Sequence, residues 1–395
     1  MKREKSIPDI WGIRQRTNEL VSRCQTGRYQ QWHDSIIEES NSLLKSGETG
    51  RAETAARIPA EEAVTLAWAW LFTKREEYSI AALERLLVVA SRTGAWAGED
   101  HSAMYPEVRA DLILSETIKA SATALSMLDS GLDSKQRWFL TQACCVLPGQ
   151  IIYGDSQKGA WWGNALNSNW TSVLNSALGF AGIVGLDQPG ADTKPWIDLA
   201  RKSILDMLDL ASEDAGGVEG PSYWIYCFGS AQDFAVADIC LGNTDLLSHA
   251  FWAKAAEYLA YFVLPDFSGW INYGDTPYDS VTGSHVFHCI ANYNDDSTAR
   301  SNAWKFAEEM LAHHPTVIWK NLLYDPDTAP EHQDRSAPVL PRSAFFRSVH
   351  LASFRSGWES DDTLLFVRGG SNAWSHMHLD LGSFVIHSHG ERLAV

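Results

Sequence analysis

The feature that most constrains the fold is a change in hydrophobic period near residue 322. From Arg14 to about His314, apolar residues recur at spacings of three and four, the period of an amphipathic α-helix, as in Val64, Ala67, Trp68 and Leu71. Glycine and proline punctuate this stretch, for example at Gly131 and at Pro189-Gly190. We expect about a dozen helices joined by short turns. Because no repeat of fixed length occurs, the helices are expected to form an α/α toroid and not a regular solenoid.

The pattern beyond residue 322 differs. Prolines and charges fill 323–342, which is typical of a linker. Short β-branched or aromatic segments follow at 344–349, 351–354, 363–367 and 383–386, and they predict the first strands of an antiparallel β-sandwich. The predicted organisation is therefore a toroid domain at 1–322, a linker at 323–342 and an incomplete sandwich at 343–395. Since so few strands bury little core, we expect the chain to be a fragment of a longer protein.

Charge and composition exclude several functions. Lys and Arg number 32 and Asp and Glu 49, so the net charge is 32 − 49 = −17, which argues against a nucleic-acid partner. No apolar run reaches the ~20 residues that span a bilayer, so no membrane partner is expected. No leader is visible at the start, and the six cysteines form no CxxC pair. These features predict reduced thiols and a cytoplasmic location, or a periplasmic or secreted one if a leader has been removed.

The first polar cluster lies at 161–171, with the sequence WWGNALNSNWT. It holds three asparagines and three tryptophans just before an apolar helix at 173–184. Asparagine amides donate hydrogen bonds without adding charge, which suits a carboxylate or a sugar hydroxyl. The alternative is a helix N-cap beside core tryptophans.

The second cluster is the stretch EGPSYWIY at 219–226. Tyr223 and Tyr226 are three residues apart at a loop-to-helix junction, so they share a face. A tyrosine can act as general acid or base if its pKa falls from ~10 towards the working pH. The alternative is packing with a solvated hydroxyl.

The third cluster is SHMHLD at 375–380. On a strand, His376, His378 and Asp380 would point to one face. They would then form a metal-binding or acid–base cluster, and the alternative is the polar face of an exposed strand. His387 and His389 form a second pair at the same spacing. Weaker signals are the Gly274-Asp275 turn, and Arg109 at a helix start, which could reach an anion.

In this order, these segments resemble the heparinase II/III-like polysaccharide lyases over roughly residues 60–395. The matching features are Asn169-Trp170, the Glu-Gly-Pro-Ser-Tyr-Trp-x-Tyr stretch, Gly274-Asp275, and Ser-His-x-His-x-Asp followed by Gly-Ser-Phe and Gly-Glu-Arg. The resemblance implies an α/α toroid followed by an antiparallel β-sandwich, with the active site between them. It also implies β-elimination of a uronic-acid-containing polysaccharide or oligosaccharide.

The resemblance also implies residue roles. Tyr223, or else Tyr226, is the acid or base, and His376 faces it. Asn169, or else Asn167, neutralises the uronate carboxylate. His378 is a ligand of a structural zinc whose other ligands lie beyond Val395. Further substrate contacts are expected from Trp162, Trp170, Trp224, Arg109 and Asp275. Many relatives carry a histidine beside the asparagine, but 166–170 contains none.

The reaction needs these residue types because the C5 proton of a uronate is weakly acidic. Neutralising the carboxylate lets charge delocalise onto it as the proton leaves. One tyrosine can serve a syn elimination, whereas tyrosine and histidine divide an anti elimination, and neither requires a metal. A protein of charge −17 that admits a polyanion is expected to have a locally positive cleft.

Two other functions remain open at this stage. A glycoside hydrolase on an α/α toroid would need two carboxylates across the cleft, with candidates Glu107, Glu219, Asp275 and Asp380. A catalytically degenerate, carbohydrate-binding protein is the second alternative.

Overall fold

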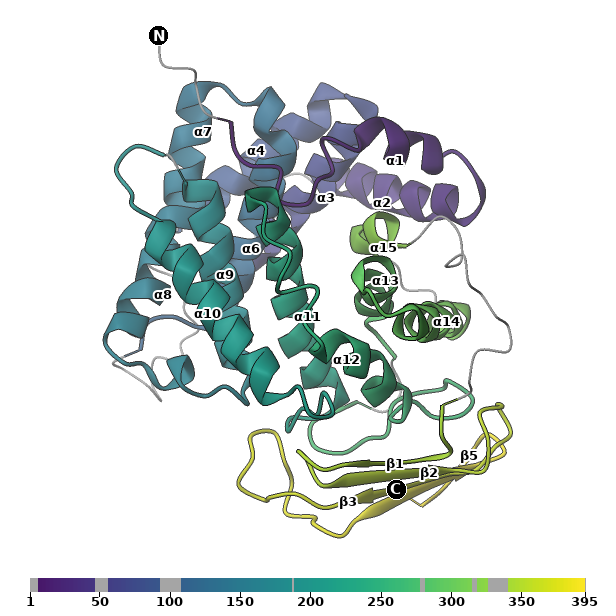
Figure 1. Cartoon of the computed structure of the whole chain (residues 1–395). Helices are drawn as coiled ribbons and strands as arrows, with labels where there is room; N and C mark the ends of the chain where they lie inside the picture. Colours follow the sequence, from purple (N-terminus) through teal and green to yellow (C-terminus); the bar gives the residue numbers. More distant parts are fainter. Residues whose placement is uncertain are drawn as a thin grey trace. The chain divides into compact units, whose positions relative to one another are not determined.

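The computed structural model describes residues 6–46, 56–92, 108–186, 188–277, 281–314, 318–325 and 340–394. The chain forms two compact units. Figure 1 labels helices and strands from which they are built. Unit 1 comprises Met1–Ala165, Trp170–Ile204 and Asp233–Thr244, and unit 2 comprises Leu166–Asn169, Leu205–Gln232 and Asp245–Val395.

Helices occupy most of the described chain up to Tyr324, which agrees with the helical period of the sequence. They are α1 (Thr17–Arg23), α2 (Gly27–Ser46), α3 (Arg57–Thr73), α4 (Glu76–Ser91), α6 (Leu112–Leu128), α7 (Ser134–Thr141), α8 (Leu147–Gln157), α9 (Asn169–Gly185), α10 (Lys194–Leu210), α11 (Pro221–Asp238), α12 (Phe251–Ala260), α13 (Ser284–Tyr293), α14 (Ser297–His313) and α15 (Trp319–Tyr324). A π-helical segment, Gln142–Val146, joins α7 to α8, and short 3-10 turns lie at Asp129–Gly131, Trp161–Gly163 and Ile239–Leu241.

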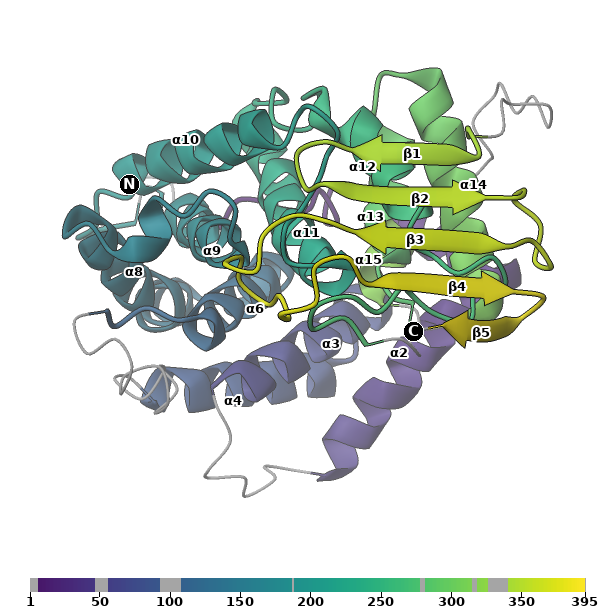
Figure 2. The ribbon, with the colours of Figure 1, turned by 90° about the horizontal axis from the view of Figure 1, so that it is seen from below.

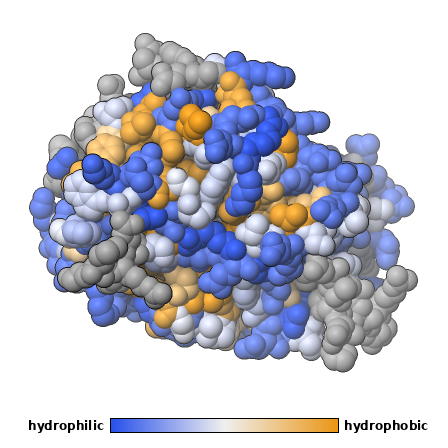
Figure 3. All heavy atoms as spheres, turned by 90° about the horizontal axis from the view of Figure 1, so that it is seen from above, coloured by the Kyte–Doolittle hydropathy of each residue, from blue (hydrophilic) through white to orange (hydrophobic). Residues whose placement is uncertain are grey.

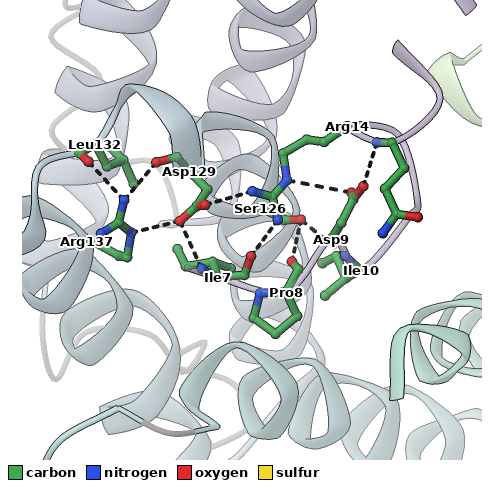
Figure 4. A network of polar contacts seen from close by, with 10 residues as sticks. Ile7, Pro8, Asp9, Ile10, Arg14, Ser126, Asp129, Leu132 and Arg137 are labelled. Atoms are coloured by element: carbon green, nitrogen blue, oxygen red, sulfur yellow. Dashed lines mark hydrogen bonds and ion pairs between the residues drawn. The ribbon is translucent and has the colours of Figure 1, made fainter. Parts of the chain in front are cut away.

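Unit 1 is fixed at its N-terminal end by a buried carboxylate (Figure 4). Asp129 follows α6 and is only 4% exposed. Its Oδ1 accepts hydrogen bonds from the backbone N–H of Ile7 at 2.9 Å and from Nε of Arg137 at 2.7 Å. Its Oδ2 accepts one from Nη1 of Arg14 at 2.7 Å. One buried charge therefore holds two segments that lie more than a hundred residues apart in the sequence.

The predicted antiparallel strands are confirmed, and they form a five-stranded meander in unit 2 (Figure 2). The strands are β1 (Ser343–Phe346), β2 (Leu351–Arg355), β3 (Leu364–Arg368), β4 (Phe384–Ser388) and β5 (Glu391–Ala394), in the order β1-β2-β3-β4-β5. Leu351 pairs with Arg368, and Leu364 pairs with His387.

One face of the sheet is buried, because alternate residues of β2 and β3 are inaccessible. Phe346 packs edge-on against Tyr258 of α12, with ring centroids 4.8 Å apart. Ser353 Oγ donates to the carbonyl of Tyr261 at 3.2 Å, so this sheet face lies on the segment that follows α12.

Residues 375–380 do not form a strand, so the one-sided arrangement that a strand would give His376, His378 and Asp380 does not arise. These residues form turns in the connection between β3 and β4. His376 has φ +59°, a left-handed conformation that no strand residue adopts. Period-two spacing alone therefore does not identify a strand here.

The surface view in Figure 3 shows hydrophilic side chains over much of one face, with hydrophobic residues in separate patches. No helix within the described ranges is long and apolar enough to cross a bilayer.

Candidate functional site

Three segments of unit 2 meet at one place: the start of α11, the turn at Gly274-Asp275 and the β3–β4 connection. The ring of Tyr223 stacks on that of His376, with centroids 3.6 Å apart and planes inclined by 15°. The backbone N–H of Asp275 donates to the carbonyl of His376 at 3.1 Å. The structure thus brings together residues from the second and third sequence clusters.

Two glycines permit this close approach. Gly220 has φ +90°, and a Cβ there would lie 2.7 Å from Oγ1 of Thr276. Pro221 then opens α11, a position that proline favours because its missing N–H would have had no helical partner. Gly274 has φ +59°, and a Cβ there would lie 2.6 Å from the carbonyl oxygen of His376. A side chain at either position would push the segments apart.

Asp275 bridges two histidines. Its Oδ2 lies 2.9 Å from Nδ1 of His376, and its Oδ1 lies 3.0 Å from Nε2 of His378. These hydrogen bonds hold the pKa of Asp275 below its ordinary value, so the group is a carboxylate near neutral pH. Because a carboxylate only accepts, His376 donates through Nδ1. In a neutral His376 ring, Nε2 is then left with a free lone pair.

Tyr223 stands opposite this histidine as a neutral phenol. Burial raises its pKa above the ordinary value of 10.0, and the negative charges of Asp275 and Glu219 raise it further. The sequence analysis required a lowered pKa for a catalytic tyrosine, and the pKa of Tyr223 is instead raised. A phenol that keeps its proton suits a general acid better than a general base.

Asn169 is the first residue of α9, and its side chain faces the interior. Asn169 is 0% exposed, and its backbone N–H and Nδ2 both donate to Oε2 of Glu219, at 2.8 and 3.0 Å. Burial raises the pKa of Glu219, and the hydrogen bonds from Asn169 offset this only in part. Asn167, in contrast, is exposed. Of the two asparagines, exposure favours Asn167 for direct contact with a ligand.

A cavity of about 230 Å³ opens beside these residues. Glu219 and Tyr223 form part of its wall, together with Leu166, Asn167, Leu210, Ala211, Gly216, Gly217, Val218, Trp224, Cys227, Phe228, Ser348, Val349 and Trp374. Among the residues that the structure describes, no lysine or arginine lines this cavity, and Glu219 is its one formally charged side chain. The described lining therefore does not have the positive charge that the sequence led us to expect.

The tryptophans predicted to stack on a sugar differ in exposure. Trp162 and Trp224 are 0% and 1% exposed, so neither presents an open indole face, and this burial does not support a stacking role. The indole N–H of Trp224 donates to the carbonyl of Ala215 at 2.8 Å. Trp170 is partly exposed and lies 5.3 Å from the ring of Trp161, within unit 1.

The remaining predicted residues are placed as follows. Tyr226 lies one turn after Tyr223 on α11 and is partly exposed. Arg109, in unit 1, is exposed, and its backbone N–H donates to Oδ2 of Asp155 at 2.7 Å. Glu107 lies outside the described residues.

The metal-ligand set predicted around His378 does not form on one strand face. The side chain of His378 is 60% exposed and is bonded to Asp275. Asp380 instead pairs with Arg368. Within the described ranges, the one compact group of three potential metal ligands does not include His378. A zinc ion at His378 stays a prediction.

The sequence did not predict two functional relationships. Asp275 is expected there as a substrate contact, and Glu219 only as a hydrolase carboxylate. In the structure, Asp275 accepts a hydrogen bond from His376, and Glu219 accepts one from Asn169. The Gly-Asp turn was the available signal, but it cannot show what the aspartate faces.

Comparison with known proteins supports the fold. The sequence matches no family model and no curated protein. The heparan sulfate lyase HepC from Pedobacter heparinus has a similar structure, with a TM-score of 0.50 and 14% identity over 85% of this chain and 47% of that one. A heparinase III gene product also matches, with a TM-score of 0.50 and 15% identity over 94% of this chain and 57% of that one. The chain spans about half the length of these structures. The similarity confirms the predicted fold class, an α/α toroid followed by an antiparallel β-sheet of the sandwich type.

Proposed function

We propose that this chain carries the catalytic residues of a polysaccharide lyase, which cleaves a uronic-acid-containing polysaccharide or oligosaccharide by β-elimination. The observation that carries the proposal is the stack of Tyr223 on His376, with Nδ1 of that histidine held by Asp275. An acid and a base lie side by side there, and β-elimination needs both. The fold-level likeness to a heparan sulfate lyase supports the same class.

The reaction divides between the two rings. Nε2 of neutral His376 takes the C5 proton of the uronate, and the carboxylate of Asp275 stabilises the imidazolium that forms. The C5–H electron pair becomes the C4=C5 double bond while the C4–O4 bond breaks. Tyr223 donates its phenolic proton to the departing O4. The raised pKa of Tyr223 supports this division over a single tyrosine acting twice.

Two groups at the cavity are suited to neutralising the uronate carboxylate. The exposed Asn167 amide donates hydrogen bonds without adding charge. Because burial raises the pKa of Glu219, this group takes up a proton more readily than an exposed glutamate, and only its protonated form would donate to the substrate carboxylate. In this proposal Asn169 is a positioning residue that fixes Glu219. A structural zinc at His378 is a separate proposal that no step above uses.

The test is to incubate the full-length protein containing this chain with alginate, heparan sulfate, hyaluronan and other uronates. Cleavage products that absorb in the ultraviolet through a C4=C5 double bond are expected, and they should be missing with His376→Ala. Saturated reducing-end products would instead indicate a glycoside hydrolase. Binding of an oligosaccharide without turnover would indicate a degenerate, carbohydrate-binding protein.

A further inference from the structure

A second cluster of chemically active side chains lies in unit 2, on α13, α14 and the end of α15. His288, Glu308 and Asp325 each offer one ligand atom, and these atoms lie within 4.8 Å of one another. None of the three lines the cavity beside Tyr223. The proposed lyase chemistry makes no use of this cluster.

His288 is the unusual member of the cluster. The residue is 0% exposed, and neither ring nitrogen makes a hydrogen bond to any residue that the structure describes. Nε2 lies 3.5 Å from Oε1 of Glu308, close enough for an electrostatic contact. Burying a polar group without a hydrogen bond is costly, because its interaction with water is lost and not replaced. Coordination to a cation would replace it.

We propose that His288, Glu308 and Asp325 bind a divalent transition-metal cation, with Zn²⁺ the best match. One imidazole and two carboxylates are ligands that zinc accepts, and the two negative charges balance the ion. In a tetrahedral site, ligand atoms about 2.0–2.2 Å from zinc lie about 3.3–3.6 Å from one another. Nε2 of His288 and Oε1 of Glu308 already have this spacing, at 3.5 Å, and since all three ligand atoms lie within 4.8 Å, side-chain shifts of about an ångström bring the set together. Water can complete the coordination.

The backbone around the cluster is already organised. Nδ2 of Asn321 on α15 donates to Oγ of Ser284 at the start of α13, at 2.9 Å. The backbone N–H of Asp325 closes α15 by donating to the carbonyl of Asn321 at 2.9 Å. Two of the three ligand-bearing helices are thus joined independently of a metal. The ion would add a direct link between α14, which already packs against α13, and the end of α15.

The experiment measures zinc binding to the whole chain after treatment with a chelator. Because His378 is a second candidate ligand, the starting protein carries His378→Ala. We expect one equivalent of Zn²⁺ by calorimetry, and a higher unfolding temperature with Zn²⁺ but not with Mg²⁺, which disfavours imidazole. Glu308→Gln and His288→Gln in this background should each weaken zinc binding at least about tenfold. Loss of a residue that only hydrogen-bonds to a metal ligand already weakens binding by about tenfold, and loss of a ligand should cost at least as much.

The matched control is His313→Gln, which changes an exposed histidine on α14 itself and should leave zinc binding unchanged. Failure of the His378→Ala protein to bind one equivalent of Zn²⁺ would overturn the proposal. Undiminished binding by Glu308→Gln would also overturn it. Because the Glu308 side chain is 26% exposed, this variant decides the matter if His288→Gln does not fold.

Discussion

The imidazole of His376 lies face to face with the phenol of Tyr223, and the ring centroids are 3.6 Å apart. Tyr223 stands on the first turn of a helix, whereas His376 stands in a strand connection more than 150 residues later. Asp275 fixes the imidazole from a third segment. The contact therefore joins the second and third sequence clusters and the Gly274-Asp275 turn.

Loss of the Tyr223 hydroxyl should remove the proposed proton donor. In Tyr223→Phe we expect kcat on a cleaved uronate to fall at least about 100-fold, the usual size of a general-acid contribution. Ultraviolet absorbance of the unsaturated product measures this. Tyr226→Phe, one turn further along the same helix, is the matched control. Equal losses in both variants would argue against a specific role for Tyr223.

The charge of Asp275 should be visible in the pH profile. The negative charges of Asp275 and Glu219 disfavour the phenolate and so raise the pKa of Tyr223. Asp275→Asn removes one of these charges, so the alkaline limb of kcat should move to lower pH. The same variant should lower kcat, because the imidazolium loses its partner. Asp295→Asn, an exposed change elsewhere, should leave the profile in place, and an unmoved limb in Asp275→Asn would contradict this assignment.

The Asn169–Glu219 pair should control stability and its pH dependence. Because the folded-state pKa of Glu219 is raised, the folded protein binds this proton more tightly than the unfolded chain does. This group therefore favours folding at low pH, and its contribution is lost as pH rises from the unfolded pKa through the folded one. Glu219→Gln should remove this loss and unfold at the same or a higher temperature at pH 7.

Asn169→Ala serves as the contrasting variant for this pair. It removes the Nδ2 donor from a buried carboxyl group and should cost about 1–2 kcal/mol in the free energy of unfolding. Urea denaturation at pH 5 and pH 7 measures both variants. A less stable Glu219→Gln protein at pH 7 would show that the charged form is the one that the fold favours.

The Asp129 network should be the main anchor of the N-terminal segment of unit 1. Asp129→Ala leaves two arginines without their buried partner, and we expect a loss of about 3 kcal/mol in the free energy of unfolding. Asp133→Ala, a few residues away, removes only an exposed helix cap and should cost about 1 kcal/mol. Similar losses in both variants, measured by urea denaturation, would mean that the buried charge adds little.

The sequence predicted those parts of the fold that depend on local patterns. The helices follow from apolar spacings of three and four, the strands follow from short β-branched and aromatic segments, and both are present. At 375–380, polar residues recur at a spacing of two without a strand, because distant partners contact the backbone there. Gly274 approaches the carbonyl of His376 closely, and Arg368 donates to the carbonyl of His378 at 3.1 Å. No local pattern encodes such contacts.

The roles within the asparagine cluster depended on burial, which the sequence does not fix. Asn169 and Asn167 are chemically identical and two residues apart, yet one binds Glu219 in the interior and the other lines the cavity. Burial also decides the role of Trp162. Its residue type suits stacking on a sugar, but its side chain lies in the core. Residue type predicted the chemistry available, and long-range packing decided which residue can supply it.

The β3–β4 connection is closed at its base by two backbone hydrogen bonds, from Arg368 to Ser383 and from Gly382 to Arg368, both 2.9 Å long. The residues between them carry His376 and His378 but add no rung to the β-ladder. His376 and His378 therefore lie outside the ladder that joins β3 to β4. Substitutions at these two positions leave the backbone pairing of the strands intact.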